Sequence, residues 1–123
     1  MKILKEAAFW QRVKTDAAYE HLWYTYILRC EDGSLYSGIT TDLPRRFREH
    51  ASGTKKGAKY TRRHPPVRFE AAWQSETRAE ASRLEYRLKR LTKAEKEALI
   101  SGSLPEKPDM TGYVRTEIPE AKA

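Results

Sequence analysis

Four side chains that can bind an anion or move a proton lie in one short stretch of the chain: the phenols of Tyr26 and Tyr36, the guanidinium of Arg46 and the imidazole of His50. A guanidinium can make a forked contact with two oxygens of a phosphate, which a lysine cannot reproduce. A phenol titrates near pH 10 and an imidazole nearer neutrality, so either acts as a base only in suitable surroundings. The alternatives are a solvated arginine and a structural histidine. These residues predict chemistry on an anionic group if the fold brings them together.

Glu85 is a fifth candidate, from a distant part of the sequence. It follows Ala81 by four residues and precedes Leu88 by three, so on a helix it borders the apolar stripe rather than the solvent face. A carboxylate in that place needs a cation as its partner. The spacing alone leaves two partners equally open: a bound metal ion, or an ion pair with Arg45, Arg46 or Lys89.

The elements that must position these side chains begin with a predicted hairpin and a helix. Residues 23–28 alternate with the period of two that is typical of a strand, and residues 34–39 supply the return strand. Asp42 is a good N-cap for a helix that runs through His50, and Pro44 is tolerated in its first turn.

The turn of the hairpin decides whether the two phenols can act together. A two-residue turn at Asp32-Gly33 would place Tyr26 and Tyr36 on opposite faces. A three-residue loop that starts one residue earlier, with its glycine in the left-handed region, would pair Leu28 with Tyr36 and Tyr26 with Gly38. Both phenols would then share one face. The sequence leaves the two turns open, and the chemistry requires the second.

The predicted helix presents one stripe to the rest of the protein. Leu43, Arg46, Phe47 and His50 follow one another at helical spacing on one side of the cylinder. Leu43 and Phe47 are the expected buried anchors, so Arg46 and His50 should lie beside the core. The residues expected to point away are Arg45, Arg48 and Glu49.

These motifs together resemble those of the GIY-YIG nucleases, over about Trp23 to Ile100. Tyr24-Thr25-Tyr26 stands where the first triplet of the family would be, and Tyr36-Ser37-Gly38 stands where the second would be. Arg46 follows the second triplet at the separation of the family's arginine, and Glu85 resembles its metal-binding glutamate. The resemblance is closest to small single-domain bacterial members of the URI type.

The resemblance implies an endonuclease that hydrolyses DNA phosphodiester bonds with one Mg²⁺ or Mn²⁺ ion, in DNA repair or recombination. Glu85 would hold the metal largely through water molecules, and Arg46 would bind a nonbridging phosphate oxygen. Tyr36 is the expected general base, with Tyr26 positioning the attacking water. His50 is the second candidate for the base, because its pKa is nearer neutrality.

The chain also departs from the family pattern. Tyr24 replaces the glycine of the first triplet, Ser37 replaces an apolar residue of the second, and no asparagine follows Glu85, where several members carry one. One alternative is therefore a nucleic-acid-binding module of the same fold that has lost catalysis. Another is a small protein-interaction domain whose basic face meets an acidic protein. The enzyme is favoured because binding alone needs no glutamate facing a phosphate.

The remaining segments complete an α/β fold of the α+β type, with a three-stranded antiparallel sheet flanked by helices. The third strand is expected at residues 67–74, followed by a helix from Thr77 to about Arg90 and a shorter one from Thr92 to near Gly102. The expected organisation is an appended helix at residues 1–20, the nuclease domain at 21–101 and a flexible tail at 102–123.

Positive charge is concentrated in the middle of the chain. Between residues 45 and 68 there are nine lysines and arginines and one acid, Glu49, whereas the whole chain has a net charge of +7. A solvated surface is the alternative, but this segregation favours nucleic acid as the partner. The substrate is expected to be DNA, whether single-stranded, duplex or branched, with RNA possible. The predicted contact residues are Lys55, Lys56, Lys59, Tyr60, Arg62 and Arg63, with the tyrosine able to stack on an unpaired base.

Composition limits the cellular setting. No run of apolar residues approaches the roughly 20 needed to span a bilayer, so no membrane partner is expected. Cys30 is the only cysteine, which excludes an internal disulfide and a cysteine-based zinc cluster and fits a reducing cytoplasm. The sequence does not specify an oligomeric state.

Overall fold

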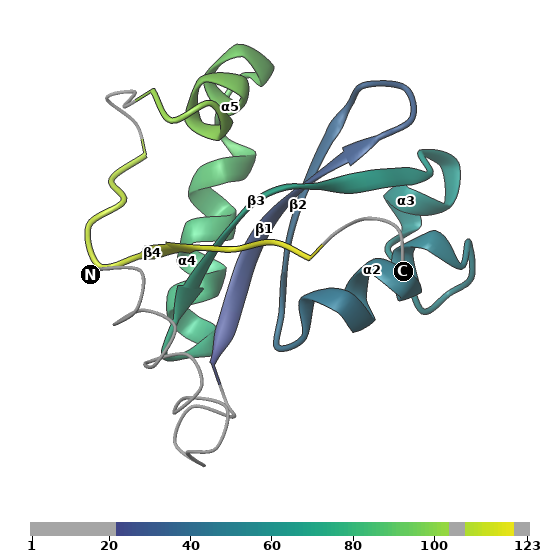
Figure 1. Cartoon of the computed structure of the whole chain (residues 1–123), viewed down its shortest axis with the longest axis horizontal. Coiled ribbons are helices and arrows are strands. Elements are labelled where there is room, and N and C mark those ends of the chain that lie inside the picture. Colours follow the sequence, from purple (N-terminus) through teal and green to yellow (C-terminus); the bar gives the residue numbers. More distant parts are fainter. Residues whose placement is uncertain (1–21, 104–107, 120–123) are drawn as a thin grey trace.

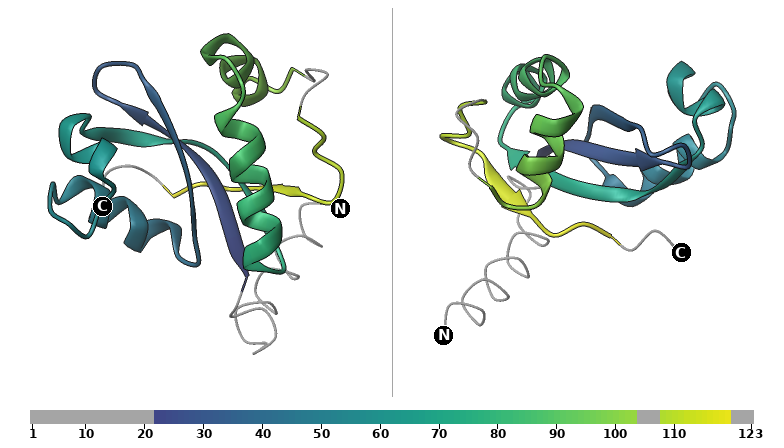
Figure 2. Two further views of the ribbon diagram at one scale, coloured as in Figure 1. Left: turned by 180° about the vertical axis from the view of Figure 1, so that it is seen from behind. Right: turned by 90° about the horizontal axis from the view of Figure 1, so that it is seen from above.

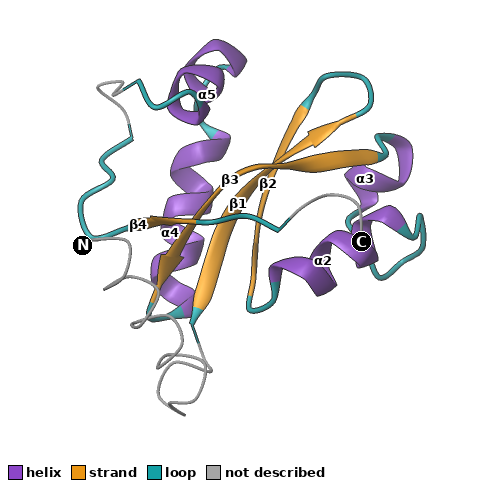
Figure 3. Cartoon of the chain, in the orientation of Figure 1, coloured by secondary structure: helices purple, strands orange, loops and turns teal. Residues whose placement is uncertain are grey.

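A four-stranded antiparallel sheet with the strand order β2-β1-β3-β4 forms the centre of the computed structural model, which describes residues 22–103 and 108–119 (Figure 1). The strands are β1 (Trp23–Cys30), β2 (Leu35–Thr40), β3 (Pro66–Ser75) and β4 (Val114–Thr116). The helices are α2 (Leu43–Ala51), α3 (Lys59–Arg63), α4 (Arg78–Lys89) and α5 (Lys93–Ile100) (Figure 3). The helix expected at residues 1–20 lies outside the described residues.

The sheet has one strand more than the three that the sequence predicts. The additional strand, β4, pairs with β3 and comes from the segment expected to be a flexible tail. Two of its three residues, Val114 and Arg115, are exposed, so the strand has no alternation of buried and exposed side chains by which the sequence could reveal it. The free backbone groups along the edge of β3 provide its partners.

The hairpin of β1 and β2 closes with the three-residue loop, the second of the two turns considered. The Cys30 N–H donates to the Ser34 carbonyl at 2.9 Å, and the Gly33 N–H donates to the Cys30 carbonyl at 2.9 Å. Gly33 has a φ of +83°, in the left-handed region that glycine adopts without steric cost.

Side chains of β1 point alternately to two faces of the sheet, and helices cover both faces. Ile27 packs with Leu84 and Leu88 of α4, whereas Tyr26 packs with Leu43 of α2. Figure 2 shows α4 and α2 on opposite sides of the sheet. Because α4 also contacts the edge strand β2, its long side chains can reach past that edge toward the Tyr26 face. Among the described residues, no helix is long and apolar enough to cross a bilayer.

The helix starts follow the sequence closely. Asp42 accepts a hydrogen bond from the Arg45 N–H at the start of α2, as expected for an N-cap. Thr77 caps α4 in the same way, and Thr92 opens α5 with a complete capping box. Capping satisfies backbone N–H groups that have no partner within the helix, so these positions are encoded locally.

The segment from Gly53 to Pro66 contains the short helix α3. Apolar periodicity could not reveal it, because Thr61 is its only buried residue. Gly57, just before α3, allows the chain to pass close to α2: a Cβ there would lie 2.7 Å from the Glu49 carbonyl oxygen and 2.9 Å from the His50 Cα. The close passage brings α3 against the end of α2.

Candidate active site

Tyr26 and Tyr36 lie on the same face of the sheet. In the register of β1 with β2, Leu28 is opposite Tyr36 and Tyr26 is opposite Gly38. Residues that face each other across two strands point to the same side, as do alternate residues of one strand. The hairpin therefore meets the first geometric requirement for joint action of the two phenols.

Gly38 provides the room in which the Tyr26 ring lies. A Cβ on Gly38 would collide with the Tyr26 hydroxyl and would lie 2.7 Å from its Cζ. The glycine of the second triplet thus has a steric role: it lets the phenol cross the backbone of the neighbouring strand.

Tyr26 is joined to α2 and α3 by a buried chain of hydrogen bonds. Its hydroxyl lies 2.7 Å from His50 Nε2, and His50 Nδ1 lies 2.7 Å from Thr61 Oγ1. The Thr61 hydroxyl donates to the Ala58 carbonyl at 3.0 Å, so it accepts from the Nδ1–H of His50. The Ala58 N–H also approaches His50 Nδ1, at a longer 3.4 Å. We place the imidazole proton on Nδ1 because its contact with Thr61 is the shorter of the two. His50 Nε2 is then unprotonated and accepts a hydrogen bond from the Tyr26 hydroxyl.

Burial shifts both partners of this pair toward their neutral forms. It raises the pKa of Tyr26 well above its usual range, against the opposing effect of the Arg46 guanidinium. Burial, and then the positive charge of Arg46, lower the pKa of His50 to about 4. At neutral pH, Tyr26 is therefore a protonated donor and His50 a neutral acceptor. Both side chains are almost completely inaccessible to solvent.

Arg46 lies beside this pair and is held from two directions. Its Nη1 donates to Glu49 Oε1 at 2.9 Å and to the Lys56 carbonyl at 2.7 Å. Glu49, which the helix pattern pointed away from the core, turns back to make this contact. The side chain of Arg46 is 23% exposed, so it remains accessible to an anion while its position is fixed.

Glu85 reaches the same region from α4. Tyr36 and Glu85 are both among the electrostatic neighbours of the Tyr26 hydroxyl. Glu85 Oε2 forms an ion pair with Lys89 Nζ at 3.2 Å. Lys89 is one of the three cationic partners that the sequence left open for Glu85. Its side chain is 23% exposed. The other four candidate residues thus lie around the phenol of Tyr26.

The donor set fits a hydrated divalent cation rather than a closed metal site. Among the described residues, no three or more of the types His, Cys, Asp and Glu gather where they could hold a metal ion together. A single accessible carboxylate, as Glu85 provides, suits Mg²⁺, which is usually bound by one or two carboxylates and keeps several water molecules.

Aromatic rings connect Tyr36 with the basic segment. The Tyr36 ring packs edge-on against His50, with centroids 5.4 Å apart, and is stacked with Tyr60 at 5.5 Å. Tyr60 in turn stacks on His64 at 4.0 Å, and His64 Nδ1 lies 2.7 Å from a carboxylate oxygen of Asp32. The end of α3 is thereby attached to the hairpin turn.

The predicted nucleic-acid contacts are exposed around α3. Tyr60, 37% exposed, combines contact with Tyr36 and access to solvent. The exposed basic members of the set are Lys55, Lys56, Lys59, Arg62 and Arg63. Their surface adjoins the site through Tyr60 and through the contact of Arg46 with the Lys56 carbonyl.

Sequence reasoning missed two residues that build the site. Thr61 fixes the tautomer of His50, and nothing in its sequence context signals this role. Gly57 permits a close approach, and the only signal was that it is a glycine. Gly38 was named as a member of the second triplet and as the pairing partner of Tyr26, but its steric role was not predicted. Lys89 was named only as one possible partner of Glu85.

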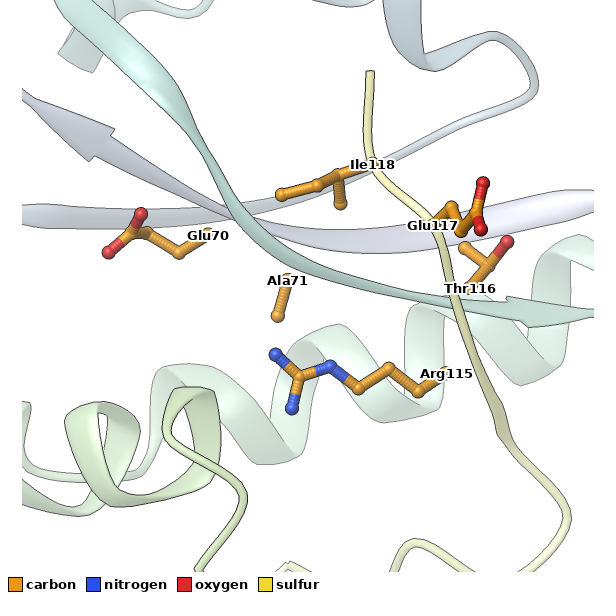
Figure 4. A pocket seen from close by; sticks show the side chains of 6 residues that line it. All are labelled: Glu70, Ala71, Arg115, Thr116, Glu117 and Ile118. Carbon is orange, nitrogen blue, oxygen red and sulfur yellow. The ribbon is translucent and has the colours of Figure 1, made fainter. Parts of the chain in front are cut away.

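A separate pocket of about 330 Å³ lies between β3 and the chain around β4 (Figure 4). Its lining residues are Glu70, Ala71, Arg115, Thr116, Glu117 and Ile118. The Arg115 guanidinium donates to the carbonyls of Leu99 and Ile100 at the end of α5, which is a structural role. None of the five candidate site residues lines this pocket.

The fold and this constellation define a class of protein. A model of the GIY-YIG catalytic domain matches residues 22–98, so the chain belongs to the GIY-YIG catalytic domain family. The matched region contains all five candidate site residues. This confirms the resemblance found in the sequence.

The similarity extends to particular relatives. The chain is 53% identical over 78 residues to UPF0213 protein BH0048 of Halalkalibacterium halodurans, covering 63% of this chain and 81% of the relative. It is 46% identical over 82 residues to a UPF0213 protein of Cronobacter sakazakii, covering 67% and 84%. A solution NMR structure of UPF0213 protein BH0048 from Bacillus halodurans is 51% identical, covers 65% of this chain and 83% of that chain, and has a TM-score of 0.42.

Proposed function

We propose that this protein is a metal-dependent endonuclease that hydrolyses DNA phosphodiester bonds. The observation that carries the proposal is the grouping of the other candidates around Tyr26 and its hydrogen-bond partner His50. The Tyr36 ring packs on His50, and Lys89 contacts Glu85 while lying over the Tyr36 ring. Arg46 lies beside the Tyr26 hydroxyl. Membership of the GIY-YIG family supports it, because the converging residues are those that the family resemblance assigns to catalysis.

Arg46 binds the scissile phosphate in this proposal. Glu49 and the Lys56 carbonyl both engage its Nη1, and the Tyr26 hydroxyl is a further partner of the guanidinium. The N–H groups that these contacts leave over can face a nonbridging oxygen. A charged donor held in place before the substrate arrives stabilises the charge of the transition state without reorganising. Removing such a donor typically lowers the rate by about 10²-fold to 10³-fold.

Of the two phenols, Tyr36 is the one with access to solvent. In this proposal it acts as the phenolate, its own proton having passed to solvent, and takes the proton of the attacking water. Tyr26 is buried, and its hydroxyl donates a hydrogen bond to His50. It therefore positions the neighbouring side chains of the site instead of acting as the base. His50 uses both ring nitrogens within the protein and is therefore a positioning residue rather than the competing base.

Glu85 is the residue that would hold the cation, with water completing the shell. When bound, a divalent ion supplies charge neutralisation at the phosphate and at the departing oxygen. The Mg²⁺ or Mn²⁺ requirement and a role in DNA repair or recombination are parts of the proposal. So is a cytoplasmic location, which agrees with the single, buried Cys30.

The exposed basic segment from Lys55 to Arg63 provides the contact to nucleic acid. Its positive charge adjoins Arg46 and Tyr36, so a phosphate backbone lying on it would pass the proposed catalytic residues. Tyr60 has an exposed ring that can stack on an unpaired base near the cleaved phosphate.

The decisive experiment incubates the purified protein with labelled single-stranded, duplex and branched DNA, and with RNA, in Mg²⁺ or in EDTA. We expect cleavage in Mg²⁺ only, and its loss in Glu85→Gln and Arg46→Ala. Glu76→Gln, which changes an exposed acid elsewhere, should remain active. Cleavage that persists in EDTA or in Glu85→Gln would refute the proposed mechanism.

The ion pair between Glu85 and Lys89 favours one alternative, a nucleic-acid-binding module without catalysis. In such a protein the pair would be a permanent helix contact. Binding of DNA without cleavage in any divalent metal would establish that alternative.

A further inference from the structure

Lys89 has a place in the site that no catalytic assignment explains. Its Nζ lies 3.2 Å from Glu85 Oε2 and 5.6 Å from the centroid of the Tyr36 ring. One ammonium group thus contacts the proposed metal ligand and lies over the ring of the proposed base. An exposed lysine at the end of a helix could extend into solvent, but this one turns into the site.

Several features direct Lys89 toward Glu85. The two residues are one helical turn apart, with the acid on the N-terminal side, which is the favourable order for such a pair. The face of the Tyr36 ring attracts a cation. Burial, and then the positive charge of Lys89, lower the pKa of Lys96 in α5, so a like charge opposes movement of Lys89 in that direction.

We propose that Lys89 is the resident counter-ion of Glu85 and competes with the divalent cation for that carboxylate, so that Lys89 raises the metal concentration the site requires. This inference rests on the proposed metal role of Glu85. Lys89 acts through Glu85 and is a positioning residue, not a catalytic one.

The expected effect follows from the strength of such a pair. Lys89 is half exposed and Glu85 is less exposed. An ion pair of this kind is weak, so breaking it to free the carboxylate for a metal ion lowers the metal-binding constant by no more than a few-fold. Removing the ammonium also removes its direct repulsion of a doubly charged ion. Together these give an expected gain in metal affinity of about fivefold.

The test measures Mn²⁺ binding to the full chain without nucleic acid, using electron paramagnetic resonance of the free ion. Lys89→Met should bind Mn²⁺ about fivefold more tightly than the wild type. Lys89→Arg keeps the charge and should stay within about twofold of the wild type. Arg83→Met is the matched control, because it removes one exposed positive charge from the same helix, and it should also stay within about twofold.

Three outcomes would overturn the inference, and they separate its failure from that of the proposed function. If Glu85→Gln loses Mn²⁺ but Lys89→Met behaves like Arg83→Met, Lys89 does not compete, although the metal site stands. If Lys89→Arg binds as tightly as Lys89→Met, the charge is not responsible. If Glu85→Gln binds Mn²⁺ as well as the wild type, the metal assignment fails together with this inference.

Discussion

The hydroxyl of Tyr26 and Nε2 of His50 lie 2.7 Å apart inside the protein, so a phenol and an imidazole that could each have served as a base form one buried unit. The pair holds the first triplet of the motif against α2. It leaves Tyr36 as the phenol that faces solvent. In the proposed mechanism, catalytic and structural roles are thereby divided between two tyrosines that look equivalent in the sequence.

The buried histidine predicts a pH dependence of stability. The pKa of His50 in the folded protein, about 4, lies below the ordinary value of about 6.5. Between these values the unfolded chain binds more protons, so the free energy of unfolding should rise with pH from about 4 to 6.5 and then level off. The contribution lost at the acid end is about 3 kcal/mol.

Urea unfolding of the wild type and of His50→Gln at several pH values measures this contribution. Carboxylates whose pKa is lowered, such as Glu70 and Glu97, also lose stabilising interactions in acid, but they are common to both proteins. The wild type should lose more stability than the variant as the pH falls. Parallel curves would show that His50 is not held neutral.

Gly38→Ala tests the close approach of the Tyr26 ring to the neighbouring strand. The new Cβ would lie 2.7 Å from the Tyr26 Cζ, and the ring cannot easily withdraw, because Phe69 packs edge-on against it at 5.2 Å. We expect a loss of about 1–3 kcal/mol in the free energy of unfolding and a large loss of activity.

Ser37→Ala is the control at the adjacent position. Ser37 Oγ is buried and finds no hydrogen-bond partner among the described residues, so its removal should leave stability unchanged or slightly higher. Urea unfolding of both variants measures the contrast. Equal effects at positions 37 and 38 would contradict the steric role of the glycine.

Arg46→Lys tests whether the fork of the guanidinium matters beyond its charge. We expect the rate of the cleavage step to fall about 10²-fold or more, with DNA binding changed only a few-fold. Single-turnover kinetics at saturating protein measures the step directly. Arg45→Lys is the matched control on the exposed side of α2, and a comparable loss in that variant would mean that Arg46 has no special role.

The double variant Arg62→Ala/Arg63→Ala tests the contact surface around α3. If both arginines bind phosphates, the plot of log affinity against log salt should become shallower by up to about 2, while the cleavage step at saturation is retained. The pair Arg83→Ala/Arg90→Ala removes the same charge from α4 and its C-cap. An unchanged slope, or the same change in both variants, would remove the basis for assigning DNA binding to α3.

Most local elements could be predicted from the sequence, because their signals are short-range. Caps at Asp42, Thr77 and Thr92 and the alternation in β1 depend on neighbours only a few residues away. The stripe that places Arg46 and His50 beside the core is equally local, since it needs only the helical repeat. The segregation of positive charge between residues 45 and 68 is readable without any structure.

Only the tertiary structure decided which of these residues meet. The residues of the turn that ends at Gly33 are compatible with either register of β1 against β2. Pairing of β1 with β3, together with pairing inside the hairpin, selects the register observed. The strand β4, the contact of Thr61 with His50 and the approach of Glu85 and Lys89 past the edge of β2 all join segments far apart in the chain. Such contacts depend on the packing of whole elements, which no local spacing encodes.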